Sequence, residues 1–366
     1  MCHFFWNQCA QITRNTAELA KLNRNPGLLY PLIKLVFSMG DKLDSISLGF
    51  TAHAIAKISS CSKLQVDPKL WDTLRDNAMK VESFTAKQTG NILWSFAKAD
   101  HPVPELFDKM ATHAMSMLDD FARTPKTMST TLWAYAKLGH PAPELLGAFS
   151  PLITEKANVL DEQDISNALW AYSKLGVEDP ELFDAIARTA SRRLSRFQPR
   201  PISVIFLSFS HINHDVPQFF DAAEDVVIQS FQTFTPRQFH NVLTAYTIKG
   251  HKPHKLLEAV KESSLKWNQF NPYEMMKVLE AYAKFDCKAP NLFDNLAKEL
   301  IAQIDRIRPS ELPGILRPYA QLQHNCSELF DAISQRIQEG EYVFSQEERD
   351  DLIWAYEGLG YEVPQL

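Results

Sequence analysis

A short phrase that recurs along the chain constrains its fold more than any other feature. It occurs as LWSFAK at 93–98, LWAYAK at 132–137, LWAYSK at 169–174, AYAK at 281–284 and IWAY at 353–356. With its aromatic residue as an anchor, intervals of 36 to 41 residues separate ten positions: Leu19, Ile55, Phe96, Tyr135, Tyr172, Phe209, Tyr246, Tyr282, Tyr319 and Tyr356. A unit of this length buries its apolar face only against neighbouring copies, so the period predicts a stacked array.

Each unit predicts a helical hairpin. Around an anchor such as Tyr172, apolar residues fall at −7, −4, −3, 0 and +3, which is one stripe of an α-helix. The residues at −1 and +1 are mostly small, which suits close packing of successive first helices. A second helix is expected to begin at Pro68, Pro104, Pro143, Pro180, Pro217 or Pro290, because a proline at the first helical position loses no hydrogen bond.

The repeat therefore predicts an all-α fold, a right-handed α-solenoid of about ten helical hairpins of about 37 residues. We expect one domain over 1–366, with an incomplete last unit. The first helix before Tyr319 contains Pro313, Gly314 and Pro318, so we expect that helix to be short or bent.

Composition excludes several classes of protein. No apolar run approaches the roughly 18–20 residues that span a bilayer, so membrane insertion is not expected. The five cysteines lack disulfide or zinc spacing, which favours a soluble protein in a reducing compartment. The first 17 residues carry no acid and include Arg14, a pattern compatible either with a weak organellar transit peptide or with structured protein.

Catalytic and metal-binding patterns are missing from the sequence. The pairs His211/His214 and His251/His254 lack further ligands, so no metal is expected. We find no glycine-rich phosphate loop, nucleophile elbow or paired catalytic carboxylates. The sequence therefore predicts neither an enzyme, nor a cofactor, nor a small-molecule substrate.

Positive charge gathers on the face of the first helices that points away from the core. The four outward positions, at −9, −5, −2 and +2, hold 13 Lys or Arg and three acids over the ten units. The whole chain has a net charge of −6, so charge is segregated by face. A basic stripe of this kind is typical of a polyanion site, and the lack of acids beside the lysines makes nucleic-acid binding the preferred explanation.

Three tryptophans occupy the same outward position in consecutive units, each between an Asn or Thr and a Lys. A flat ring can stack on a base, an amide can bond a base edge and an ammonium can neutralise a phosphate, which suits single-stranded RNA. The tryptophans could instead cover the seam between helices, or contact a protein partner. The candidate RNA-binding residues, strongest over 84–240, are Lys87, Asn91, Trp94, Lys98, Lys126, Trp133, Lys137, Asn167, Trp170, Lys174, Arg200, Arg237 and Asn241.

The segment WAYAKLGHPAPELL at 133–146, with relatives at 94–107 and 170–183, resembles the repeats of octotricopeptide, heptatricopeptide and FAST-kinase-like proteins. The resemblance covers essentially the whole chain. It implies a mitochondrial or plastid α-solenoid that binds single-stranded or ribosomal RNA in transcript stabilisation, processing, translation or ribosome assembly. Many such proteins end in a RAP domain, which this sequence does not show. The alternative is a protein scaffold, such as a structural subunit of an organellar ribosome or another multi-protein assembly.

Overall fold

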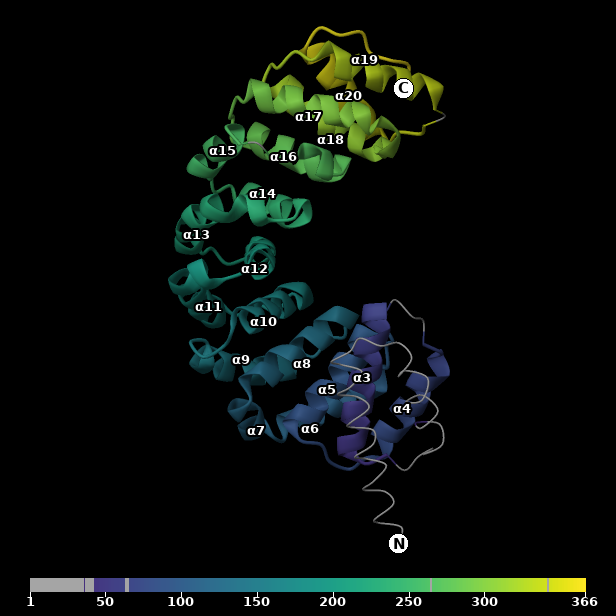
Figure 1. Ribbon diagram of the computed structural model, residues 1–366, viewed down its shortest axis with the longest axis vertical. Helices are drawn as coiled ribbons and strands as arrows, with labels where there is room; N and C mark the ends of the chain where they lie inside the picture. The colour runs from purple at the N-terminus through teal and green to yellow at the C-terminus, as the bar shows by residue number, and fades with distance from the viewer. Residues whose placement is uncertain (1–35, 37–42, 63–65, 264, 341) are drawn as a thin grey trace. The chain divides into compact units, whose positions relative to one another are not determined.

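The computed structural model describes residues 36, 43–62, 66–263, 265–340 and 342–366, and all secondary structure within these ranges is helical (Figure 1). The residues fall into two compact units, Met1–Thr189 and Ala190–Leu366. Within each, helices pack on adjacent neighbours as in a helical solenoid, which confirms the predicted fold class. The repeat anchored at Leu19 lies outside the described residues, and a single domain over 1–366 stays a prediction.

In the first unit, the first helices of successive hairpins lie side by side. They are α3 (Ser45–Ser62), α5 (Ala86–Lys98), α8 (Pro125–Leu138) and α10 (Glu162–Leu175), and each packs on the next (Figure 1). The second helices are α4 (Pro68–Lys80), α6 (Pro104–Met115), α9 (Pro143–Lys156) and α11 (Pro180–Arg193), the last of which runs into the second unit. A short helix, α7 (Leu118–Arg123), accommodates the longer interval between Phe96 and Tyr135.

The second unit repeats this arrangement. Its first helices are α12 (Pro199–His211), α14 (Pro236–Lys249), α16 (Pro272–Lys284), α18 (Leu312–Gln321) and α20 (Gln346–Gly358). Its second helices are α13 (Pro217–Ser230), α15 (His254–Lys261), α17 (Pro290–Ala302) and α19 (Ser327–Glu339). Short 3₁₀ turns precede the first helices α12 to α18, as η2 (Leu194–Arg196), η3 (Phe231–Thr233), η4 (Trp267–Gln269), η5 (Ile304–Arg306) and η6 (Pro309–Glu311).

Proline marks the helix starts as predicted. All six second helices expected to begin at a proline do so. Helix α18 has 10 residues, whereas α16 has 13, which confirms the short helix predicted before Tyr319. The cause is local, because the chain over Pro309–Glu311 forms a 3₁₀ turn and α18 begins only at Leu312, next to Pro313.

The anchor tyrosines are buried and hydrogen-bonded to the preceding hairpin. Tyr135 Oη donates to the Phe107 carbonyl at 2.7 Å and Tyr172 Oη to the Leu146 carbonyl at 2.7 Å. The same bond recurs at Tyr246, Tyr282, Tyr319 and Tyr356, with lengths of 2.9, 2.6, 2.9 and 3.1 Å. A carbonyl oxygen has two lone pairs, so it can accept this bond beside its helical one. Burial raises the pKa of these phenols, that of Tyr356 to about 12.

In several hairpins, a histidine in the turn between the two helices contacts an aspartate of the preceding hairpin. The rings of His140, His251 and His324 lie 2.8, 2.9 and 2.8 Å from the carboxylates of Asp108, Asp221 and Asp294. Each aspartate directly follows the residue whose carbonyl accepts the tyrosine bond. The histidine at 251 therefore belongs to a recurring structural contact with the preceding hairpin.

Replacing Tyr172 by Phe should lower the free energy of unfolding by about 1 kcal/mol, because one buried hydrogen bond is lost while the Leu146 carbonyl keeps its helical partner. Urea unfolding followed by circular dichroism measures the change. The matched control is Tyr273→Phe, since the Tyr273 side chain is 39% exposed and its hydroxyl bonds none of the described residues. Equal stability of the two variants would contradict a stabilising role for the anchor hydroxyl.

Candidate nucleic-acid interface

The candidate RNA-binding residues of the first unit all reach its surface. The lysines at 87, 98, 126, 137 and 174 are exposed. The side chains of Asn91, Trp94, Trp133, Asn167 and Trp170 are half-buried. The exposed lysines stand at positions −9 and +2, near the two ends of each first helix, whereas the half-buried residues stand at −5 and −2, in the middle of the same outward stripe.

The three tryptophans form a continuous row of rings across α5, α8 and α10. The ring centroids of Trp94 and Trp133 are 6.5 Å apart with planes inclined by 34°, and those of Trp133 and Trp170 are 6.4 Å apart at 33°. His53 on α3 extends the row, 4.8 Å from Trp94. We call His53, Trp94, Trp133 and Trp170 the aromatic row.

The aromatic row crosses the seams between successive first helices. Its ring separations lie within the 4.5–7 Å range typical of aromatic pairs, so each ring gains contact from the next unit. This geometry agrees with the interpretation that the tryptophans cover the seams. The rings are only half-buried, however, and their outer surface stays open to a ligand.

Two of the candidate lysines have acidic partners, which corrects the premise that no acids stand beside them. Lys126 Nζ lies 3.2 Å from Asp161 Oδ2, and Lys137 Nζ lies 2.6 Å from Asp100 Oδ1. Both aspartates lie just outside the four positions on which the charge count rests. Ion pairs between exposed side chains contribute about 0–1 kcal/mol, so a phosphate can compete for either lysine.

The other three candidate lysines, Lys87, Lys98 and Lys174, form no salt bridge within the part of the chain that the structure describes. The candidate amides also differ. Asn167 Oδ1 accepts a hydrogen bond from Gln163 Nε2 at 2.8 Å. The side chain of Asn91 forms no hydrogen bond with any described residue. Its backbone carbonyl accepts a hydrogen bond from Ser95 Oγ. The amide of Asn91 is therefore available to a ligand.

In the second unit, Arg200 and Arg237 are exposed and Asn241 is half-buried. Further along the same unit, two of the three outward cations on α16 and α18 are paired, whereas the exposed Lys284 forms no salt bridge among the described residues. Lys277 bonds Glu280 at 2.7 Å and lies over the Tyr273 ring, while Arg317 bonds Asp351 at 2.9 Å and lies over Trp354. The outward face of α16, α18 and α20 thus carries its own counter-charges.

His240 is close to two outward cations, Arg237 and Lys277. Burial, together with the charges of Arg237 and Lys277, lowers the pKa of its imidazole to about 4. The ring packs edge-on against Tyr273, with centroids 5.7 Å apart. The imidazole is therefore neutral at physiological pH and adds no charge to this face.

Stability should fall as the pH drops from about 6.5 towards 4, because the unfolded chain binds a proton at His240 that the folded chain resists. In His240→Ser this contribution is lost, so the drop in urea midpoint between pH 7.5 and pH 5 should be smaller than in the parent. Serine suits the site because Ser129, Ser166 and Ser203 hold the same repeat position. An equal drop in both proteins would rule out His240 as a source of acid sensitivity.

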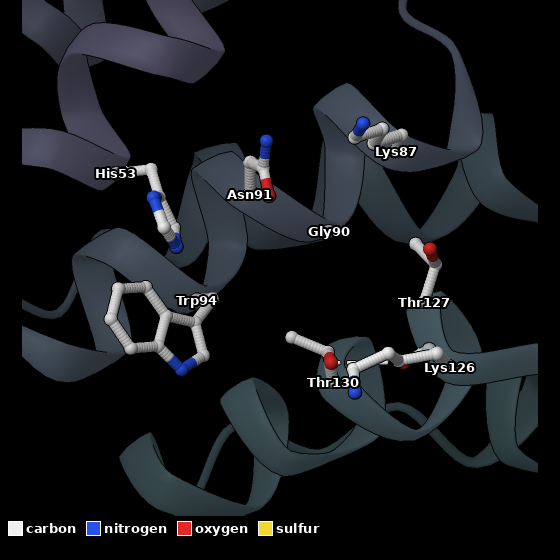
Figure 2. Close-up of a pocket in the computed structure, with 8 residues that line it drawn as sticks. All are labelled: His53, Lys87, Gly90, Asn91, Trp94, Lys126, Thr127 and Thr130. Carbon is white, nitrogen blue, oxygen red and sulfur yellow. Dashed lines mark hydrogen bonds between the residues drawn. The ribbon is translucent and has the colours of Figure 1, made fainter. Parts of the chain in front are cut away.

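A pocket of about 310 Å³ lies beside the aromatic row, between α5 and α8. Figure 2 shows Lys87, Asn91 and Trp94 along α5, with Lys126, Thr127 and Thr130 across from them on α8. The pocket is also lined by His53 and Gly90. At Gly90 the two helices come so close that a Cβ atom there would lie 2.7 Å from the Thr127 methyl carbon.

Sequence reasoning found four of the eight residues around this pocket and missed four as functional candidates: His53, Gly90, Thr127 and Thr130. Thr130 stands at −5, the repeat position of Asn91, so its register could have identified it. His53 stands at the repeat position of the tryptophans, so its register could have identified it. Gly90 and Thr127 stand at −6 and −8, next to the core stripe, and nothing in a single helix marks them. They become part of a surface pocket only because two neighbouring helices meet there.

The fold and this face define a helical-repeat protein with an aromatic and basic surface on its first helices. The model of the family described as RNA-editing substrate-binding complex 6 protein matches residues 49–288, well over half of the 366 residues. The chain belongs to that family. The match agrees with the broader part of the resemblance, an RNA-associated helical-repeat protein, while the octotricopeptide assignment stays a prediction. No curated protein matches the chain, and no helix of the described residues is both long and apolar enough to cross a membrane.

Proposed function

We propose that this protein binds single-stranded RNA as a non-catalytic subunit of an RNA-editing complex, through the outward face of α5, α8 and α10. The observation that carries the proposal is the aromatic row, whose three tryptophans on α5, α8 and α10 are half-buried. Each of these three helices has an exposed lysine at +2 and an exposed lysine or glutamine at −9. We further propose that it acts in a mitochondrion or plastid.

The chemistry of this face supports RNA over a protein ligand. Proteins commonly bind single-stranded nucleic acids with aromatic rings beside cations, because every base has a flat face that can stack and every nucleotide carries a negative charge. Three of the five lysines there have no internal counter-charge among the described residues. A protein-binding scaffold has no physical need to concentrate unpaired cations along a row of tryptophans.

The family name supports the proposal from a second direction. The matched model describes a protein of an RNA-editing substrate-binding complex, and the matched residues 49–288 include α5, α8, α10, α12 and α14. All candidate RNA-binding residues, from Lys87 to Asn241, fall inside this range. The multi-protein complex in that name also suits the partners expected of a helical array, whose other faces stay free for protein contacts.

Changing Lys87, Lys98 and Lys174 together to Glu should abolish binding to a single-stranded RNA and lower its salt dependence, because phosphate contacts release counterions. Loss of three such contacts reduces the slope of log affinity against log salt by about 2. Fluorescence anisotropy with a labelled RNA of mixed sequence, between 50 and 200 mM salt, measures both quantities.

The matched control reverses three exposed cations on other helices of the same unit, Lys69 on α4, Arg123 on α7 and Arg188 on α11. This variant has the same net charge as the first and should keep most of the parent affinity. If the two variants lose binding equally, long-range charge and not this face carries the RNA. If the lysine variant binds like the parent, the protein contacts RNA elsewhere or acts as a scaffold.

Replacing Trp133 by Leu separates the stacking role from the seam role. Leucine keeps apolar cover over the seam, as Leu207 does at the same repeat position, but offers no ring to a base. A stacking role predicts a loss of RNA affinity of about tenfold or more with little change in the melting temperature. A seam role alone predicts the reverse, a lower melting temperature with unchanged affinity.

A further inference from the structure

The seam between α5 and α8 differs from the next seam along the same unit. Between α8 and α10, Ser129 Oγ donates to Asp164 Oδ1 at 2.8 Å, and both side chains are buried. Gly90 and Thr127 hold the equivalent positions between α5 and α8, where glycine provides no side chain to bond. The polar groups of this seam therefore line a pocket and do not satisfy one another.

The polar groups around this pocket remain available to a ligand. The Asn91 amide offers a donor and an acceptor side by side, and neither bonds a described residue. Thr130 Oγ1 donates to the Lys126 carbonyl at 2.9 Å, which leaves its oxygen free to accept. A base edge presents the complementary pattern of donors and acceptors.

The charged and aromatic groups complete the set that a nucleotide needs. Trp94 presents a ring at one end of the pocket, as Figure 2 shows, and Lys87 and Lys126 approach from the two opposite helices. Lys87 forms no described salt bridge. The pair between Lys126 and Asp161 joins side chains that are 74% and 51% exposed, so it yields readily to a phosphate.

We propose that this pocket holds one nucleotide of the bound RNA, with its base against Trp94 and bonded to Asn91, and its phosphate between Lys87 and Lys126. This inference rests on the proposed function and adds that one nucleotide of the strand is selected by its base. The volume of about 310 Å³ is at the lower end of the roughly 300–1,000 Å³ found for small-ligand sites, which suits a single nucleotide.

The pocket gives the face a point of selection that the seam between α8 and α10 lacks. At the next seam, Ser129 and Asp164 bond each other and Asn167 Oδ1 accepts from Gln163, so fewer polar groups are left there for a base. Trp133 and Trp170 can still stack on bases there, but stacking tolerates every base. The loss of Asn91 should therefore reduce the preference for one base much more than it reduces the overall affinity for RNA.

The test compares affinities for labelled homo-oligomers of adenosine, cytidine and uridine in the parent protein and in Asn91→Leu. The parent should favour one base by about tenfold, the typical effect of one well-placed pair of polar base contacts. Asn91→Leu should lose this preference and bind all three oligomers like the weaker ones. The matched control is Asn291→Leu, an exposed asparagine on α17, which should keep the preference.

A second readout locates the nucleotide without a variant. Ultraviolet cross-linking of the bound RNA, followed by mass spectrometry after trypsin, should find nucleotides on peptide 88–98, which contains Asn91 and Trp94. The proposal is overturned if the parent binds all three oligomers equally, if Asn91→Leu keeps the preference, or if cross-links avoid this peptide. In those cases the proposed function still stands, whereas a parent that binds no RNA removes both.

Discussion

The bond from an anchor tyrosine to a carbonyl of the preceding hairpin is the constraint on which the rest of the structure depends. In the six described first helices whose anchor is a tyrosine, it joins the helix to the fourth residue of the second helix before it, as in Tyr135 with Phe107 and Tyr246 with Phe220. A phenol buried this deeply needs a partner, so the rotation of the first helix about its axis is fixed. Once that rotation is fixed, every other position of the helix has a defined direction.

On α8 and α10, which carry Tyr135 and Tyr172, the geometry of the aromatic row follows from this constraint. Small residues on both sides of the anchor, such as Ala134 and Ala136, are buried and let neighbouring first helices approach closely. Side chains at equal repeat positions then lie at nearly equal separations, as the two tryptophan pairs show with 6.5 and 6.4 Å. The half-exposed rings are thus a direct product of regular stacking, and the same regularity brings the flanking lysines to the surface.

Whatever depends on one helix could be predicted from the sequence, and whatever depends on two could not. The rules for helix ends predict which helices begin at a proline. The period of 3.6 residues per turn predicts which anchors are buried and which tryptophans face outward. The pairs of Lys126 with Asp161 and Lys137 with Asp100 join residues 35 and 37 positions apart, and their distance depends on how two helices are offset. The pocket at Gly90 and the lowered pKa of His240 likewise arise only where neighbouring elements meet.

A regular array can supply affinity but little selectivity, because identical units make identical contacts with every nucleotide. Selectivity for one base must come from units whose residues differ from the repeat. Here the departure is a small one, a glycine at position 90 where the next unit has Ser129, and at this seam a pocket with polar lining takes the place of an internal hydrogen bond. A second kind of departure occurs on α16 and α18, where Lys277 and Arg317 pair with acids, so that two positive charges of the face are compensated internally. Under the proposed function, departures of these two kinds give the repeated surface a part that selects a base, a part that binds RNA without selection and a part that is left to other partners.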